Sequence, residues 1–247
     1  MFEGKANPIQ SYSDLNLDAS FSFHERFGIS IFIPYVLSQS YKYRSLSEDL
    51  WYLEDLSGKN GLGDIRLGGW YIFRDHTSHR LMFHPAFKLA TGSPFDELNY
   101  PEFEPTGTGQ TSLELNLLGD FKLLENLLLS FKTGYIINFS GDFNTVTHSW
   151  NEDPGNVINL SGRLSINPLD YLSIGFEVGY HYQDAFKVGG EKTKNTDIHY
   201  YLISPLIGYQ THLRSTTISL MGGYYNTFNG KNTLQWNTLN ISLMIYL

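Results

Sequence analysis

Apolar and polar residues alternate along most of this chain, in stretches that are long for β-strands. Within 127–140, apolar residues occupy every second position except Thr133, and polar or small residues fill most of the positions between them. The stretches 64–74 and 112–122 repeat this two-residue period. Such a period places successive side chains on opposite faces of a strand, whereas an amphipathic helix repeats every three to four residues. The pattern therefore predicts an all-β chain whose strands have one apolar face.

Eleven alternating segments follow one another, and the connections between them alternate in length. Short turns join the two strands of a pair, and most of the connections between pairs are longer and polar. Tight turns at one end, longer loops at the other and strands of about ten residues are typical of outer-membrane barrels. We therefore predict one transmembrane antiparallel up-and-down β-barrel over residues 1–247. Its strands are expected near residues 13–24, 28–37, 63–75, 80–91, 111–122, 127–141, 157–167, 171–184, 197–210, 215–227 and 233–247.

A soluble β-barrel is the alternative fold, because soluble strands also alternate when one face packs on a core. Soluble strands are commonly only about five or six residues long, which is shorter than the segments found here. A membrane-spanning helix is not predicted, since it needs about 20 nearly uninterrupted apolar residues. No stretch of the chain meets that requirement. The barrel in lipid is the favoured interpretation.

Composition excludes several kinds of chemistry. The chain has no cysteine, so disulfides and thiolate metal sites are impossible. Its net charge is −8, and its 17 Lys and Arg residues are scattered singly, which is unlike a surface that follows nucleic-acid phosphates. Aromatic residues make up 15% of the chain, consistent with the aromatic girdles of membrane barrels. We expect a lipid bilayer as partner, no nucleic acid, no metal and no cofactor.

Four short motifs, taken together, resemble a known family. They are the segments 29–36 (ISIFIPYV), 61–68 (GLGDIRLG), 88–92 (KLATG) and 107–110 (GTGQ). Their order and spacing are similar to those of the "meta-pathway of phenol degradation" family of outer-membrane β-barrels, over about residues 10–247. The resemblance implies a barrel, often described as a transporter, that passes small hydrophobic or aromatic molecules.

The strand count bears on the N-terminal end of the barrel. Bacterial single-chain barrels have an even number of strands, with both ends in the periplasm. Eleven strands ending in the periplasm would begin outside the cell, so we expect about twelve strands, the first preceding residue 1 together with a signal peptide. Residues 1–5 contain neither the basic nor the apolar region of such a signal. The alternatives are that two strands are merged in the count, or that residues 1–10 form a short strand.

Charged side chains within the strands are assigned to the barrel interior. A Lys or Arg that faces lipid at mid-membrane costs about 2–4 kcal/mol. Inside, Arg66 can pair with Glu114, and Lys132 with Asp120 or Glu177, across neighbouring strands. Such residues either form salt bridges that close the lumen and stabilise the barrel, or they form a polar lining that selects which solutes pass. The polar candidates for the lumen are Arg66, Arg74, His84, Lys88, Glu114, Asp120, Lys132, Arg163, Glu177 and His181.

Two of the longer connections carry candidate binding groups. The segment 38–62 is rich in apolar and aromatic residues, so it could fold into the barrel mouth and receive a hydrophobic solute. A short helix over 46–56, packed on the rim, is the alternative. The loop 92–110 is acidic and could bridge divalent cations to lipopolysaccharide. The aromatic candidates at the mouth are Tyr41, Tyr43, Trp51 and Tyr52.

No catalytic group is predicted. The chain contains no Gly-x-Ser-x-Gly motif, and His24, His199 and His212 do not stand beside the Ser and Asn expected of an outer-membrane phospholipase. We therefore predict a non-enzymatic channel or transporter for small hydrophobic or aromatic molecules. The main alternative is a structural or surface-interaction barrel with a closed, salt-bridged lumen, and a phospholipase is less favoured.

Overall fold

The computed structural model contains only β-strands as regular elements in the parts of the chain that it describes. Among these residues, no helix is long and apolar enough to cross a membrane. The described residues are 9–47, 50–57, 60–92, 110–144, 149–213, 216–232 and 237–246.

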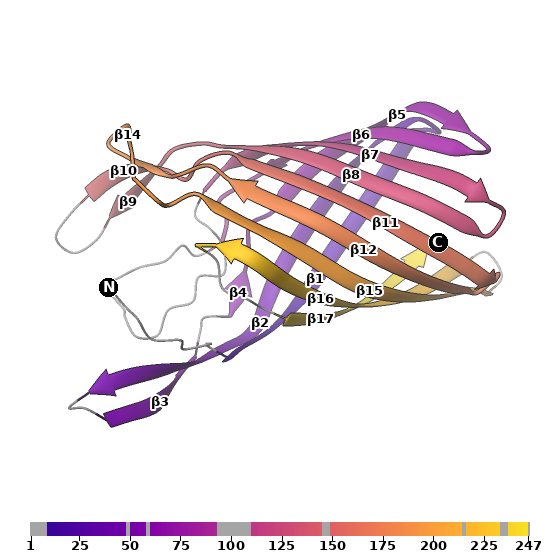
Figure 1. The fold of residues 1–247 in the computed structure, drawn as a ribbon. Helices are drawn as coiled ribbons and strands as arrows, with labels where there is room; N and C mark the ends of the chain where they lie inside the picture. Colours follow the sequence, from indigo (N-terminus) through magenta and orange to yellow (C-terminus); the bar gives the residue numbers. More distant parts are fainter. Residues whose placement is uncertain are drawn as a thin grey trace.

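One curled antiparallel sheet forms the wall of the molecule (Figure 1). Thirteen strands belong to it, and two of them, β3 and β4, branch from β2, which leaves eleven strands paired in chain order. This arrangement confirms the predicted antiparallel up-and-down fold and its eleven strands. They are β1 (Ile9–His24), β2 (Phe27–Ser47), β5 (Arg66–His76), β6 (His79–Lys88), β7 (Ser112–Leu124), β8 (Leu127–Asn138), β11 (Val157–Leu169), β12 (Leu172–Gln183), β15 (Ile198–Leu213), β16 (Thr216–Lys231) and β17 (Asn237–Tyr246).

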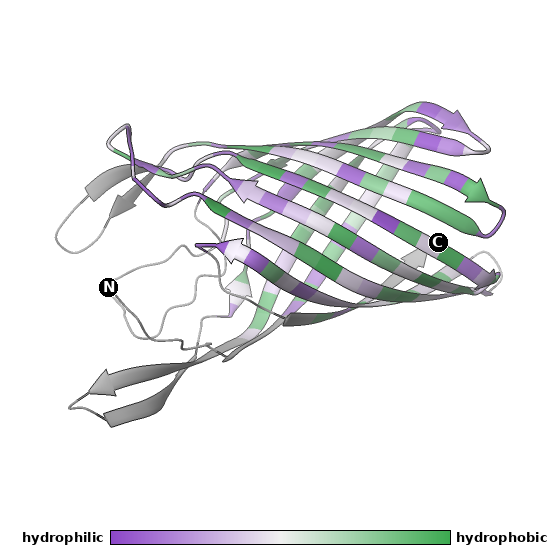
Figure 2. Ribbon diagram, in the orientation of Figure 1, coloured by the Kyte–Doolittle hydropathy of each residue, from purple (hydrophilic) through white to green (hydrophobic). Residues whose placement is uncertain are grey.

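The outer face of the sheet is an apolar belt. Val178 and Ile207, on neighbouring strands, are 52% and 57% exposed. Figure 2 shows hydrophobic and hydrophilic positions alternating along the wall strands, so the belt continues around the sheet. An exposed apolar surface of this extent marks contact with a membrane rather than with water. The apolar rows therefore face lipid, and each polar row faces the interior.

The segment 38–62, for which the sequence predicts a loop or a short helix, is largely β-structure. β2 continues to Ser47, and β3 (Leu50–Ser57) folds back on it in antiparallel register. β4 (Gly61–Leu62) then pairs with the middle of β2. The helix is therefore wrong, because the ladder of β2 continues outward and keeps the backbone groups of this segment paired.

The structure does not describe the side chains of several residues that are predicted to act at the barrel mouth. These include the aromatic candidates of the β2–β3 hairpin and the acidic loop residues that could contact lipopolysaccharide. Their binding roles stay predictions. The residues are Tyr41, Tyr43, Trp51, Tyr52, Asp96, Glu97, Glu102 and Glu104.

A second, four-stranded sheet joins two of the longer connections. It consists of β9 (Gly141–Asn144), β10 (Ser149–Asp153), β13 (Lys187–Val188) and β14 (Glu191–Lys192). Lys187 Nζ donates to Asp153 Oδ2 over 2.8 Å. The turn that follows β10 contains Gly155 with φ +74°, where a Cβ would collide with the backbone of Asp184. These contacts tie the 140–156 connection to the 184–196 connection.

We predict that the Lys187–Asp153 contact at this second sheet is lost at acidic pH. The hydrogen bond from Lys187 holds the pKa of the Asp153 carboxyl below its ordinary value. Because the pKa of Asp153 is lower in the folded protein, its ionised carboxylate stabilises the fold fully above the ordinary pKa of about 3.9. This stabilisation is lost as the pH falls through the lowered pKa of the folded state. An NMR titration of Asp153 should therefore have its midpoint below the ordinary range.

The Lys187→Met variant is the matched control for this titration, since it keeps the length of the side chain and removes the donor. Its Asp153 midpoint should return towards the ordinary value. Identical midpoints in both proteins would contradict the assignment of the lowered pKa to Lys187.

A charge placed on the outer belt should destabilise the barrel. Val178 lies near the middle of β12, so Val178→Arg should cost about 2–4 kcal/mol of unfolding free energy in phospholipid vesicles. Ser20 lines the interior and offers a control, because Ser20→Arg places the same charge in the lumen. Urea titrations that gave equal losses for both variants would rule out lipid as the medium that Val178 contacts.

Candidate functional site in the barrel lumen

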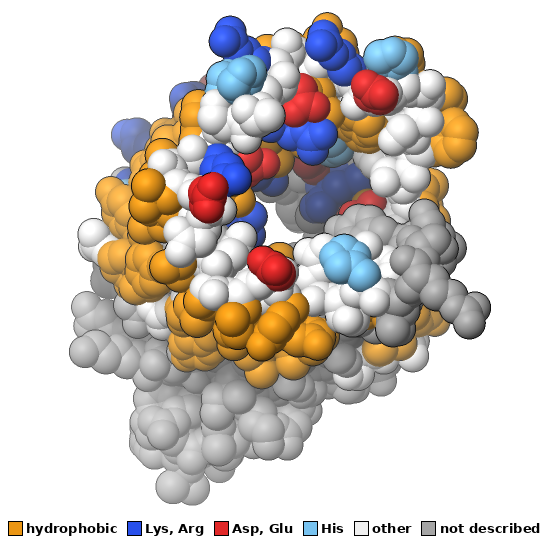
Figure 3. Space-filling view, turned by 90° about the vertical axis from the view of Figure 1, so that its right-hand side faces the viewer, with side chains coloured by type: hydrophobic (Ala, Val, Ile, Leu, Met, Phe, Trp, Pro, Cys, Tyr) orange, Lys and Arg blue, Asp and Glu red, His pale blue; other side chains and the backbone are white. Residues whose placement is uncertain are grey.

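The interior of the barrel is hollow. Figure 3 looks onto the end that carries the short turns and shows an opening ringed by basic and acidic side chains. The largest of the cavities lined by the described residues has a volume of about 790 Å³ and lies against the inner face of β1, β2 and β5–β8. Its lining combines apolar side chains such as Trp70 and Leu118 with charged ones such as Arg66, Glu114 and Lys132.

Strand register gathers charged residues into one row across the wall. In neighbouring strands from β6 to β12, Arg80 pairs with Asp120, Asp120 with Ser130, Ser130 with Arg163, and Arg163 with Glu177. Ser130 Oγ donates to Asp120 Oδ1 over 2.6 Å. Directly opposed cross-strand residues share a face, so all five side chains are on the same side of the sheet. We call this set the charged row.

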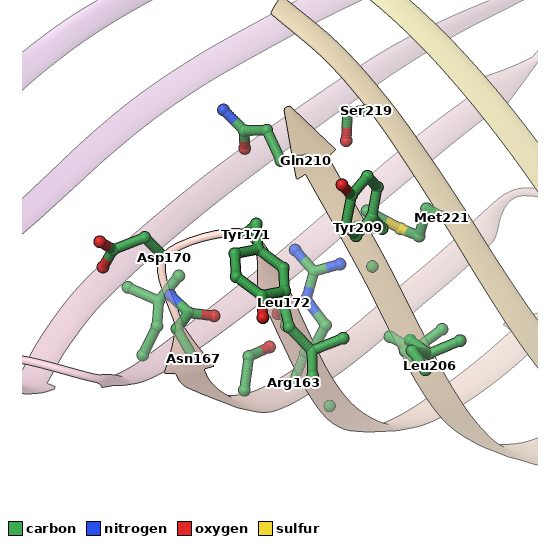
Figure 4. A pocket seen from close by; sticks show the side chains of 16 residues that line it. Arg163, Asn167, Asp170, Tyr171, Leu172, Leu206, Tyr209, Gln210, Ser219 and Met221 are labelled. Carbon is green, nitrogen blue, oxygen red and sulfur yellow. The ribbon is translucent and has the colours of Figure 1, made fainter. Parts of the chain in front are cut away.

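Arg163 is under-satisfied within the charged row. Its Nε is buried and has no hydrogen-bond partner among the described residues. No ion pair joins it to Glu177 within the described part of the chain, although the two residues are direct cross-strand partners. Figure 4 shows Arg163 at a cavity of about 250 Å³, with Leu206 and Met221 on nearby strands. The guanidinium therefore retains donor capacity towards the lumen.

The next row towards the longer loops begins with three apolar residues, which are followed by a lysine and a serine. Ile72 pairs with Met82, Met82 with Leu118, Leu118 with Lys132, and Lys132 with Ser161. Ile72 is buried, whereas Met82 and Leu118 are partly accessible. We call Ile72, Met82 and Leu118 the apolar strip. Lys132 stands at its end and lines three of the cavities, with volumes of about 790, 320 and 210 Å³.

A third row is built from uncharged polar and aromatic side chains. His181 Nδ1 lies 2.7 Å from Asn159 Oδ1, and the His181 ring stacks on Tyr200 with 4.6 Å between centroids. Further along the row, Asn116 Nδ2 donates to the backbone carbonyl of His84 over 3.3 Å. The His84 ring itself lies 3.3 Å, at Nε2, from Ser30 Oγ, so both histidine rings are engaged by neighbouring polar groups. Among the described residues, no three His, Asp or Glu side chains form a metal-binding group.

Salt bridges occupy the end of the lumen near the longer loops. Arg66 Nε lies 3.2 Å from Glu114 Oε1, and this is the pair that the sequence predicted. The Arg66 guanidinium also lies 5.4 Å from the centre of the Phe32 ring, as a cation–π contact. Lys88 Nζ is 3.7 Å from Asp64 Oδ2, and both side chains are largely buried. By contrast, Lys132 forms no ion pair with Asp120 or Glu177 in the described structure.

The Arg74 side chain does not face the lumen, although strand parity predicts that it does. A β-bulge between Ile72 and Arg74 shifts the register, so that Arg74 pairs with Leu81. Its Nε donates to His79 Nε2 over 2.8 Å at the short-turn end of the barrel. An inserted residue reverses which face the following side chains take. Arg74 is accordingly absent from the lining of the described cavities.

Most of the other predicted lumen residues come together around the described cavities. Lys88 is the further exception, because its buried bridge to Asp64 lies beside the largest cavity rather than in its lining. Arg80 lines three cavities and is missing from the predicted set, although it shares the strand parity of His84. The predicted residues in the cavity linings are Arg66, His84, Glu114, Asp120, Lys132, Arg163, Glu177 and His181.

Comparison with known proteins agrees with this architecture. Residues 10–243 match the model of the family described as "Putative MetA-pathway of phenol degradation". No curated protein matches the chain in sequence. Among solved structures, the chain is similar to the crystal structure of an outer membrane channel from Pseudomonas putida F1, with a TM-score of 0.72 and 11% sequence identity. The similarity covers 97% of this chain and 85% of the Pseudomonas putida chain. At 11% sequence identity, it shows that the two proteins share a fold.

The family model spans nearly the whole chain, and the described wall has the apolar belt and hollow interior of a membrane barrel. The chain therefore belongs to the "Putative MetA-pathway of phenol degradation" family and is a β-barrel of the bacterial outer membrane.

Proposed function

We propose that this barrel is a channel that passes small hydrophobic or aromatic molecules across the outer membrane. The observation that carries the proposal is the largest cavity, whose lining joins apolar side chains to a few charged ones. A barrel of about twelve strands encloses more space than an eight-stranded barrel, which side chains fill, and less than a porin. Small solutes are therefore the class that such a lumen suits.

The apolar part of the lining favours an aromatic or hydrophobic solute over a sugar or an ion. Trp70, Met82 and Leu118 all line the largest cavity. Sites for small organic molecules commonly combine such side chains with a small number of polar groups that fix orientation. The phenol-degradation family and the channel fold of the Pseudomonas putida protein support the same class of function. The proposed role is that of a non-enzymatic channel.

A closed structural barrel is the competing function. The Arg66–Glu114 and Lys88–Asp64 bridges favour it, because paired charges near one end can hold the wall together and obstruct passage. Four cavities along the inner wall share lining residues, such as Lys132 and Arg163, and this favours an open path instead. Planar-bilayer recordings of the full chain, combined with uptake of phenol into proteoliposomes, would distinguish the two. The channel would be overturned if the bilayer showed no conductance and if phenol uptake equalled that of liposomes without the protein.

We predict that filling one lumen cavity reduces conduction. Gly179 lines the cavity of about 210 Å³, and a Cβ there would lie 3.5 Å from its nearest atoms, which is ordinary contact. Gly179→Phe should therefore fold and lower single-channel conductance severalfold by occupying the lumen.

Gly162 provides the matched control for this substitution. It lies on the neighbouring strand and pairs with the lipid-facing Val178, and a Cβ there would meet nothing within 4 Å. Gly162→Phe adds the same ring to the outer face, so conductance should stay unchanged. Equal conductance in the two variants would mean that solutes do not pass this part of the lumen.

A further inference from the structure

We propose that the inner wall over β6–β8 holds a binding site for aromatic carboxylates, formed by the apolar strip and Lys132. This inference rests on the proposed channel and narrows its solute class from small hydrophobic or aromatic molecules to aromatic anions. The site would hold the solute on its way through the lumen.

The arrangement of the strip and the lysine matches the two ends of such a solute. Met82, Leu118 and Lys132 occupy one register row on three adjacent strands. Neighbouring strands lie about 4.8 Å apart, so the row from Met82 to Lys132 spans roughly 10 Å. An aromatic ring resting on Met82 and Leu118 would thus place its carboxylate beside the Lys132 ammonium. Methionine sulfur also makes favourable contacts with aromatic rings.

The adjoining cavity brings a second cation, Arg163, close to Lys132 and the apolar strip. The cavity of about 320 Å³ is lined by Arg80, Lys132 and Arg163 against only two carboxylates, Asp120 and Glu177. Asp120 is engaged by Ser130 over 2.6 Å, and Arg80 lies 3.5 Å from Asp75 on its own hairpin. With Arg80 paired to Asp75, Lys132 and Arg163 equal the two lining carboxylates in number, so a solute anion would be held by hydrogen bonds from these two cations and not by an excess of positive charge.

Lys132 and Arg163 are close enough in register to act on one anion. Lys132 pairs with Ser161, and Arg163 is two residues further along the same strand, so the two cations are diagonal neighbours on one face. Arg163 Nε has no hydrogen-bond partner among the described residues. Among them, Lys132 likewise forms no ion pair with the Asp120 or Glu177 carboxylate. Hydrogen bonds between such cations and a carboxylate are stronger than neutral ones.

Isothermal titration of sodium benzoate into the full chain in detergent micelles tests this site. Benzoate should bind, and benzyl alcohol, which keeps the ring and lacks the charge, should bind at least about tenfold more weakly. Lys132→Gln should weaken benzoate binding about tenfold to a hundredfold and leave benzyl alcohol unaffected. Lys132→Arg keeps the charge and should retain most of the affinity.

Lys122→Gln is the matched control, because Lys122 lies near the short-turn end of β7 and outside the cavities that Lys132 lines. Its benzoate affinity should equal that of the unmodified protein. Equal benzoate affinity in Lys132→Gln and the unmodified protein, or equal binding of benzoate and benzyl alcohol, would overturn the site. The benzyl alcohol comparison needs no variant and so does not depend on how Lys132→Gln folds.

The outcome for the proposed function is read separately, from bilayer conductance. Conductance that benzoate blocks in the unmodified protein but not in Lys132→Gln would support both proposals. Benzoate binding without any conductance would support the carboxylate site and overturn the channel. Conductance without benzoate binding would leave the channel standing and overturn the site.

Discussion

Contact with lipid is the constraint on which the rest of this structure depends. A chain surrounded by hydrocarbon must satisfy its backbone N–H and C=O groups within itself, and the curled sheet does so from β2 to β16 by pairing each of these wall strands on both edges. Because side chains alternate across a strand, apolar residues on the lipid side send the intervening polar residues to the other side. The polar rows of the lumen are thus a direct result of the medium outside.

Register then decides which polar residues act together. The two-residue period places Lys132 and Arg163 inside, but only the pairing of β8 with β11 makes them diagonal neighbours. The pairings of β6 with β7 and of β7 with β8 set the charged row beside the apolar strip, so that charged and apolar linings are adjacent. The Arg66–Glu114 bridge, in contrast, joins β5 to β7 across the intervening strand β6.

The sequence was sufficient to predict features that depend on periodicity. All eleven wall strands and most of the inward-facing charges follow from the alternation of apolar and polar residues. The orientation of Arg74 does not, because a bulge is a single inserted residue and leaves no change in the pattern. The strands β9, β10, β13 and β14 were missed because they are two to five residues long and show too few alternations. The extended hairpin of β2 and β3 required tertiary pairing information.

The sparse packing of the interior has a consequence for how such a protein can evolve. Among the described residues, the buried apolar side chains are only Val36, Ile72, Ala86, Val157 and Leu206. In a globular protein, exchanging interior residues disturbs a close-packed core and lowers stability. Here many inward positions border open volume, so mutations can alter the lining with little penalty to folding. Selectivity is therefore free to diverge between relatives while the architecture of the wall stays the same.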